Sequence, residues 1–187
     1  MHQSAPPLIN DQPILRPARP DDVDTLVELA STTFRDAYSP TDDPDDISDY
    51  VTRTFTPTFF ASILADKYST LLALVAADHL IGYVQTRMSD PPDCVTGPSP
   101  IELARVYLRQ ETIGKGYGAV LMFAVHAEAR RRGCKTIWLG VYARNQRARD
   151  FYRRWGFVDV GTKEFLFGGR SYADPVMAAP VQLPALL

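Results

Sequence analysis

The sequence predicts an α/β domain with helices on both faces of a mixed, mostly antiparallel sheet of six to seven strands. All 15 prolines lie outside residues 101–174, and this stretch holds nine of the 11 glycines. Because proline is poorly tolerated inside strands and helices, the stretch is expected to be continuous regular structure. Strand and helix patterns alternate along it, and residues 136–142 are apolar on both faces, as in a central strand.

Length and composition exclude several protein classes. The 187 residues suit a single domain, which we place at residues 14–178, with tails at 1–13 and 179–187. A hydrophobic content of 45% excludes disordered and fibrous proteins. The formal net charge of -2 argues against a general nucleic-acid binder, although it leaves a small anionic ligand possible.

The sequence shows neither a membrane span nor a secretion signal. No apolar run reaches 18 residues. The first 12 residues also lack the basic region followed by an apolar region that is typical of a secretion signal. The two cysteines, Cys94 and Cys134, form no CxxC motif, and no set of metal ligands is visible. We therefore expect a cytoplasmic protein without a structural metal or a disulfide framework.

The first half of the chain predicts a short strand, three helices and two strands. The strand covers residues 14–16, and the first helix covers 20–37, with apolar residues at offsets of three and four. Asp43 is the expected N-cap of a second helix that starts near Pro44, and a third helix starts near Pro57. Strands at 70–76 and 80–87 follow, joined by a tight turn at Asp78-His79.

The strand at residues 101–108 changes phase. Ile101 and Leu103 share one face, whereas Val106 and Leu108 share the other, so the alternation slips by one residue near Ala104-Arg105. Such a slip is typical of a β-bulge. The remaining expected elements are helices at 116–132 and 145–155 and strands at 136–142, 157–167 and 170–176.

A glycine-rich segment links the bulged strand to the next helix. Its residues are Ile113, Gly114, Lys115, Gly116, Tyr117, Gly118 and Ala119. Glycines at alternate positions leave backbone N–H groups uncovered at a helix N-terminus, which favours phosphate binding, although a merely flexible turn would have the same composition.

Three phosphate-binding motifs compete for this segment. A P-loop fails because Lys115 is followed by glycine rather than Ser or Thr. A dinucleotide-binding GxGxxA motif matches at Gly114, Gly116 and Ala119, but the next strand ends without an acidic residue, and too little chain follows for a full dinucleotide fold. The third possibility is a loop that binds the pyrophosphate of an acyl-CoA.

The segments ELARVYLRQETIGKGYGAVLM and KTIWLGVYARNQRARDFYRRWGFVDVGT resemble the GNAT superfamily of N-acetyltransferases. That superfamily carries a bulged strand, a Q/R-x-x-G-x-G/A loop and an N-x-x-A-x-x-F-Y-x-x-x-G-F motif. The second motif is matched by Asn145, Ala148, Phe151, Tyr152, Gly156 and Phe157, whereas Ile113 departs from the usual Gln or Arg. The last third of the chain is similar to the bacterial polyamine, spermidine/spermine-type, subgroup.

The resemblance implies a GNAT fold whose bulged strand splays from its neighbour and admits the pantetheine arm of acetyl-CoA. Backbone groups of Val106, Tyr107 and Leu108 would pair with that arm, and an N–H there would polarise the thioester carbonyl. The loop from Ile113 to Ala119 would bind the pyrophosphate. Asn145 would hydrogen-bond the pantetheine end of the cofactor, and Ala148 would also contact the cofactor.

The resemblance also implies catalytic roles for two residues. Tyr152 would donate a proton to the departing thiolate of CoA, although its place on an apolar stripe also fits a core tyrosine. Glu102, the only acidic residue between Asp93 and Glu111, would accept the proton of the amine, directly or through water. An ion pair with an arginine, or a solvent-facing position, is the structural alternative for Glu102.

Two groups of residues are candidates for binding the amine that accepts the acetyl group. Four aromatic residues would line the acceptor pocket, or alternatively pack in the core: Phe34, Tyr38, Tyr50 and Tyr142. An acidic stretch, formed by Asp36, Asp42, Asp43, Asp45, Asp46 and Asp49, would attract a polycation such as a polyamine. Helix capping explains part of the same stretch.

The resulting prediction is an acyltransferase that moves acetyl from acetyl-CoA to a primary amine of a polyamine-like or amino-acid-like small molecule and releases CoA. The amine would attack directly in a ternary complex, without nucleic-acid or membrane partners, in a possible homodimer. Neither cysteine is expected in the cleft, which argues against a covalent relay. The alternatives are a non-catalytic acyl-CoA sensor on the same fold and a nucleotide-binding protein that uses the glycine-rich loop.

Overall fold

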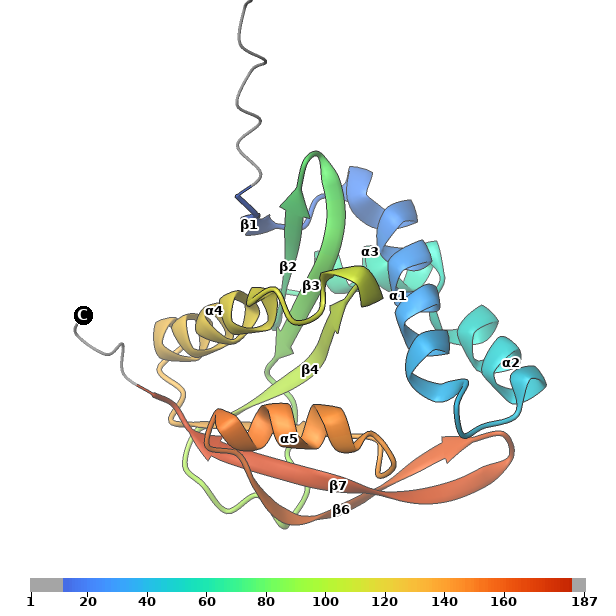
Figure 1. Cartoon of the computed structure of the whole chain (residues 1–187). Coiled ribbons are helices and arrows are strands. Elements are labelled where there is room, and N and C mark those ends of the chain that lie inside the picture. The colour runs from blue at the N-terminus through green and yellow to red at the C-terminus, as the bar shows by residue number, and fades with distance from the viewer. Residues whose placement is uncertain (1–11, 183–187) are drawn as a thin grey trace, which may run out of the picture.

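A seven-stranded sheet in the order β1-β2-β3-β4-β5-β7-β6 organises residues 12–182, which the computed structural model describes (Figure 1). Every pair of neighbouring strands is antiparallel except β4 and β5. The strands are β1 (Ile14–Pro17), β2 (Ser69–Ala76), β3 (His79–Arg87), β4 (Pro100–Leu108), β5 (Thr136–Gly140), β6 (Val158–Phe167) and β7 (Arg170–Pro180). The predicted mixed α/β sheet is thereby confirmed.

Five α-helices cover the two faces of the sheet, as the sequence predicted. They are α1 (Val23–Tyr38), α2 (Pro44–Thr54), α3 (Pro57–Ala65), α4 (Tyr117–Arg131) and α5 (Gln146–Arg154). Alternate residues of β2 show the division, because Leu71 and Ala73 pack with α1, α2 and α3, whereas Leu72 and Leu74 pack with α4 and α5. The period of two in a strand sends these pairs to opposite faces.

Local capping chemistry explains where the helices begin. Asp43 caps α2 by accepting a hydrogen bond from the N–H of Asp45 at 2.8 Å, as predicted. Thr56 caps α3 in the same way, and Asn145 caps α5 by accepting from the N–H of Ala148 at 3.0 Å. Each cap satisfies a backbone donor that the helix leaves free.

Two predicted boundaries in the first half of the chain are wrong by a few residues. The predicted helix at 20–37 opens as a 3-10 turn at residues 20–22, because the Asp22 carboxylate accepts from the N–H of Arg19 at 2.7 Å and holds that turn tight. The turn between β2 and β3 lies at Ala77-Asp78, both with positive φ, so His79 already belongs to β3.

Two further differences lie in the second half. The predicted strand at 136–142 ends at Gly140. Val141 still donates to the Pro175 carbonyl of β7, but Pro175 has no N–H to return the bond, and the N–H of Ala143 donates to the Asp174 side chain. The last strand, expected at 170–176, runs on to Pro180 and pairs with the whole of β5. Of the two predicted tails, residues 1–11 and 183–187 lie outside the described residues.

The splay in the centre of the sheet follows from the bulge in β4. The register of β4 against β3 slips so that Gln85 faces Arg105 while Thr86 faces Leu103, which leaves Ala104 as the extra residue. On its other side, β4 pairs with β5 only over residues 100–102. Beyond that point the two strands part, and Figure 1 shows β2, β3 and β4 running in a clearly different direction from β6 and β7.

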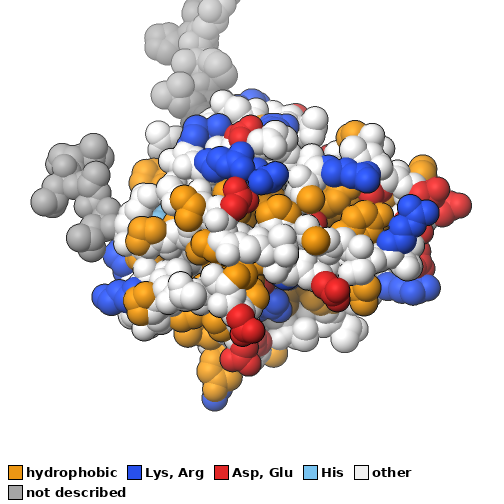
Figure 2. Space-filling model, turned by 90° about the horizontal axis from the view of Figure 1, so that it is seen from below, with side chains coloured by type: hydrophobic (Ala, Val, Ile, Leu, Met, Phe, Trp, Pro, Cys, Tyr) orange, Lys and Arg blue, Asp and Glu red, His pale blue; other side chains and the backbone are white. Residues whose placement is uncertain are grey.

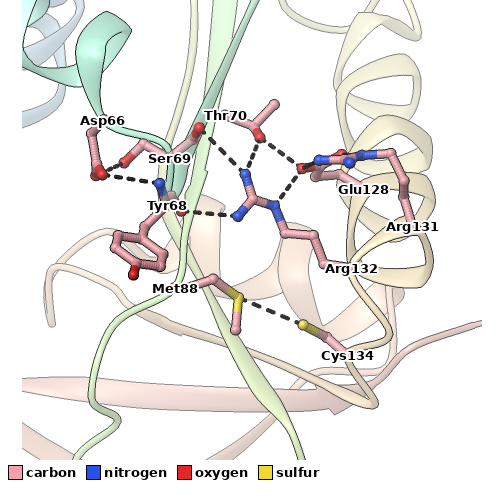
Figure 3. Close-up of polar contacts among 9 residues, drawn as sticks. All are labelled: Asp66, Tyr68, Ser69, Thr70, Met88, Glu128, Arg131, Arg132 and Cys134. Carbon is pink, nitrogen blue, oxygen red and sulfur yellow. Dashed lines mark hydrogen bonds and ion pairs between the residues drawn. The ribbon is translucent and has the colours of Figure 1, made fainter.

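A polar network fixes the end of α4 to β2 (Figure 3). The Glu128 carboxylate accepts from the Nε atoms of Arg131 and Arg132, each at 2.6 Å, and from the hydroxyl of Thr70 at 2.6 Å. Arg132 also donates to the Thr70 hydroxyl at 2.8 Å. The network lies away from the splayed strands and holds the helix that follows the glycine-rich segment.

The surface carries charges of both signs. Figure 2 shows basic, acidic and hydrophobic side chains interspersed on the face seen from below. Among residues 12–182, no helix combines the length and the apolar character needed to cross a bilayer.

Candidate active site

A cleft of about 240 Å³ opens where β4 and β5 separate. It is lined by residues 102–107 of β4, by residues 140–142 at and after the end of β5, and by residues from α1, α2, α5, β3, β6 and β7. The side of β4 that faces β5 has no strand partner beyond residue 102, so its backbone donors and acceptors are available to a ligand. Of the three residues expected to pair with the pantetheine arm, Val106 and Tyr107 line this opening, whereas Leu108 packs against the core.

The glycine-rich segment follows β4 and leads into α4. Gly114 and Gly116 have φ values of 87° and 85°, which a side chain would strain, and no neighbouring atom fills the space beside either residue. The N–H groups of residues 114–118 donate to no other described group. The segment therefore presents consecutive free donors at a helix N-terminus, the geometry of an anion site.

The other side chains of the segment differ in their surroundings. Lys115 and Ile113 are exposed beside the free N–H groups, and the Ile113 side chain supplies no hydrogen bond. A Cβ on Gly118 would come within 3.0 Å of the Phe151 ring, so this glycine serves close packing of α4 on α5. Tyr117 and Ala119 are half-buried.

Helix α5 places three predicted residues along the cleft: Asn145, Ala148 and Tyr152. Asn145 uses its side-chain oxygen to cap the helix, which leaves its amide NH₂ for another partner. Burial, with a smaller contribution from Tyr107, raises the pKa of Tyr152. The phenol is therefore protonated at neutral pH, and it makes no hydrogen bond to another described residue.

Glu102 lies in the cleft but is already paired. Its Oε2 accepts from Arg87 at 2.5 Å and from the Ser89 hydroxyl at 2.7 Å, and Lys163 Nζ is 4.0 Å from Oε1. Burial alone would raise the pKa of Glu102, but the hydrogen bonds from Arg87 and Ser89 outweigh it and lower the pKa. The ion pair with an arginine that the sequence left open is therefore present.

The four predicted acceptor aromatics meet on one wall of the cleft. Tyr50, Phe34, Tyr38 and Tyr142 form a continuous stack, with ring centroids 4.6, 4.0 and 4.3 Å apart in that order. Phe34 and Tyr38 belong to the hydrophobic core as well as to the lining of the cleft, so the two alternatives for these residues do not exclude one another. The Tyr142 hydroxyl donates to Asp42 at 2.6 Å, which closes one end of the stack.

The acidic stretch does not line the cleft. Asp42 is engaged by Tyr142, Asp43 caps α2, and Asp49 pairs with Arg53. The lining residues include no member of the stretch. Helix capping and local pairing therefore explain this part of the sequence better than attraction of a ligand into the cleft.

Four charged lining residues were missed by the sequence analysis: Arg87, Arg105, Lys163 and Asp174. Two features of the sequence could have pointed to them. Arg105 lies next to the bulge, and Asp174 shares the inward face of β7 with Val176 because the two are two positions apart in a strand. A carboxylate on the buried face of a strand usually marks a site or a pair.

Neither cysteine lines the cleft. Cys134 is buried, with its Sγ 3.8 Å from the sulfur of Met88, and burial raises the pKa of its thiol (Figure 3). Cys94 lies beside Gly161. Among residues 12–182, no group of three or more His, Cys, Asp or Glu side chains is arranged to hold a metal ion.

Solved structures share this arrangement and define the class of fold. The PaiA N-acetyltransferase of Thermoplasma acidophilum, solved in complex with coenzyme A, is 20% identical, with a TM-score of 0.77 over 90% of this chain and 99% of that one. A spermidine N-acetyltransferase of Vibrio cholerae, solved with CoA and spermine, is 20% identical, with a TM-score of 0.65 over 92% of this chain and 97% of that one. The predicted α/β fold of the GNAT acetyltransferases is thus confirmed.

Sequence comparison gives the family. The profile of the Acetyltransferase (GNAT) family matches residues 23–157. An uncharacterized N-acetyltransferase of Mycobacterium tuberculosis is 33% identical over 156 residues, which cover 83% of this chain and 96% of that protein. This chain belongs to the GNAT family of N-acetyltransferases, and the predicted enzyme class is confirmed.

Proposed function

We propose that this protein transfers an acetyl group from acetyl-CoA to the primary amine of a small molecule, polyamine-like or amino-acid-like, by direct attack in a ternary complex. The observation that carries the proposal is the parting of β4 and β5 after residue 102, which opens unpaired backbone onto a cleft that also holds Tyr152. The free N–H groups of residues 114–118 suit a pyrophosphate. These features fit acetyl-CoA, which would supply the activated thioester.

The transfer would form a bond from the amine nitrogen to the acetyl carbon and break the carbon–sulfur bond. A backbone N–H on β4, between Val106 and Leu108, would polarise the carbonyl. Tyr152 would give its phenolic proton to the leaving thiolate, and its raised pKa keeps that proton in place until then. Asn145 and Ala148 would border the pantetheine.

Glu102 would accept the proton of the amine through a water molecule. Its carboxylate is ionised at neutral pH, but a lowered pKa makes it a weak base, and Arg87 and Ser89 occupy Oε2. The remaining oxygen, Oε1, would hold the water. The pH dependence of a Glu102→Gln variant tests this role, as described in the Discussion.

Ligand binding tests the proposal first. A ligand that binds the folded state raises stability by RT ln(1 + [L]/Kd), about 2.7 kcal/mol at a hundredfold excess over Kd. We expect acetyl-CoA and CoA to raise the melting temperature saturably and ATP and NAD to leave it unchanged. A shift with ATP or NAD alone would favour the nucleotide-binding alternative.

Thiol release separates the enzyme from a non-catalytic acyl-CoA sensor. We expect CoA to be released from acetyl-CoA in the presence of a panel of primary amines and not without them. Binding without release across amino acids, polyamines, aminoglycosides and peptide N-termini would favour the sensor. A homodimer and a cytoplasmic location belong to the same proposal, and sedimentation and cell fractionation test them. The resemblance to the polyamine-acetylating subgroup is the alternative for the acceptor, and turnover of spermidine tests it.

A further inference from the structure

Arg105 is a cation in the cleft that is held by neutral groups. Its Nη1 donates to the Gln85 side-chain oxygen at 2.7 Å, and its guanidinium lies 4.7 Å from the centroid of the Phe59 ring. Gln85 is only 2% exposed, so this acceptor is fixed. Among residues 12–182, no carboxylate pairs with Arg105. Most of its five N–H donors therefore remain for a ligand.

The charge of Arg105 acts on the aromatic side of the cleft. Burial raises the pKa of Tyr107 to about 12, and the nearby Arg105 lowers it in part. The same cation opposes the effect of burial on the pKa of Tyr50 and of Tyr83. The guanidinium thus lies close to three tyrosines, where an aromatic and partly dry surrounding strengthens its attraction for an anion.

Asp174 is an anion in the same cleft without a cationic partner. It is 5% exposed, and its Oδ1 accepts the N–H of Ala143 at 3.0 Å. No described Lys, Arg or His side chain forms an ion pair with it. Because burial outweighs the Ala143 hydrogen bond and the more distant Lys163, the pKa of Asp174 is raised. A buried carboxylate with a free oxygen is suited to an ammonium group.

The other three charged side chains of the cleft already face an opposite charge. Arg87 pairs with Glu102, and Lys163 lies 4.0 Å from the same carboxylate. Arg105 and Asp174 are therefore the two cleft charges that form no ion pair within the described residues, and only the more distant Lys163 acts on Asp174. The aromatic stack lines the same cleft as both charged side chains.

We propose that the acceptor is an amine that also carries an anionic group, as an amino acid does, with Arg105 binding the anion and Asp174 facing the amino group. The inference rests on the proposed acetyl transfer and narrows its acceptor. A polyamine lacks the anion that Arg105 would bind, and the acidic stretch that would attract it lies outside the cleft. The ammonium of the acceptor would give its proton to the water held by Glu102 before attack, and Asp174 would be a positioning residue for the amino group.

Matched acceptors test the proposal. Thiol release is measured for wild type with L-amino acids, with their C-terminal amides, with the corresponding amines lacking the carboxylate, and with spermidine. We expect kcat/KM to be about 30-fold or more higher for at least one amino acid than for its amide, as the loss of one partner of a desolvated charge pair implies. In Arg105→Gln, that preference should vanish through a loss on the acid alone.

Control variants separate recognition from folding. Arg53→Gln removes one exposed positive charge outside the cleft and should preserve the preference for the acid. Arg105→Lys keeps the charge but loses the planar fork, so it should retain part of the preference. Melting temperature and CoA binding are measured for each variant, and a preference lost together with CoA binding would count against a specific role in acceptor recognition.

The outcomes distinguish this inference from the proposed function. Turnover of spermidine or of the amides at least as fast as of the amino acids would overturn the inference and leave acetyl transfer intact. An equal loss on acid and amide in Arg105→Gln would do the same. Absence of thiol release with every amine would overturn the acetyl transfer itself and the inference with it.

Discussion

Glu128 and Asp174 are both largely buried carboxylates, but only Glu128 accepts hydrogen bonds from cationic side chains. Around Glu128, hydrogen bonds from Arg131, Arg132 and Thr70 outweigh burial and lower its pKa to about 2. Around Asp174, one backbone N–H does not outweigh burial, and the pKa is raised. The comparison indicates that α4 is anchored by charges that satisfy one another, whereas the cleft holds charges that a ligand would satisfy.

Substitution of Tyr152 tests the cleft side of this comparison with the largest expected effect. Tyr152→Phe should lower kcat about 100-fold while changing the Kd for CoA less than about twofold, because the hydroxyl would act only when the thiolate leaves. Stopped assays of CoA release and calorimetric titration measure the two quantities. Tyr68→Phe, at an exposed tyrosine outside the cleft, is the control. An unchanged kcat would remove Tyr152 from the reaction.

Substitution of Glu128 tests the anchored side. Glu128→Gln should lower the free energy of unfolding by about 2 kcal/mol at pH 7, because it removes charged hydrogen bonds that hold Arg132 against β2. The folded-state pKa is lowered, so the deficit should be complete above pH 4.5 and shrink as the pH falls toward 2.

Urea denaturation at several pH values measures this difference. Glu164→Gln removes an exposed carboxylate from β6 and should change stability by less than about 0.5 kcal/mol. A deficit of the same size in both variants would mean that the Glu128 network contributes nothing specific. Activity should be unaffected once the protein is folded, because the network lies outside the cleft.

Glu102 combines features of both regions, because it is paired like Glu128 but lines the cleft. If it accepts the amine proton through water, Glu102→Gln should lower kcat/KM about tenfold at pH 7, and the loss should shrink at high pH, where the amine is already neutral. The pH profile of kcat/KM for both forms provides the measurement. A loss that is equal at every pH would assign Glu102 to holding Arg87 and Lys163 in place.

The sequence predicted the fold because its main signals are local. Proline exclusion, apolar periodicity and the phase change near Ala104 each depend on residues close in the chain, and all three correspond to elements of the sheet and its bulge. The errors lie where tertiary contacts decide. β5 ends early where its partner strand presents Pro175, which has no N–H to donate, and Asp174 then accepts the N–H of Ala143.

The sequence predicted only those parts of the candidate site whose residues lie close together in the chain. The residues of motifs, such as Asn145 and Tyr152, lie on one helix, and their spacing alone brings them to one face of the cleft. Arg105 and Asp174 come from β4 and β7, which lie on either side of β5 in the folded sheet and far apart in the sequence, and nothing local shows that these two side chains form no ion pair. Whether Glu102 is a free carboxylate likewise depends on Arg87, which the register of β3 against β4 places opposite it.

Substitution of Asp174 is expected to have the smallest effect, and the change in stability should be opposite in sign to that of Glu128→Gln. Since the folded-state pKa of Asp174 lies above the unfolded value, the ionised carboxylate destabilises the protein at neutral pH, and this penalty disappears as the pH falls below about 3.9. Asp174→Asn should therefore raise the melting temperature by a few °C at pH 7, about 1 kcal/mol in a chain of this size, with a smaller gain at acidic pH. The asparagine oxygen can still accept the N–H of Ala143.

Calorimetry of Asp174→Asn, with Asp90→Asn at an exposed loop position as control, measures that gain. The same variant should lose acetyl transfer to an amino acid, so stability and activity would move in opposite directions. A buried carboxylate retained against its own stability cost is expected where a substrate supplies the missing partner. A melting temperature that falls at pH 7 would instead place Asp174 with Glu128, as a carboxylate whose partners already satisfy it, and the contrast between the two regions would fail.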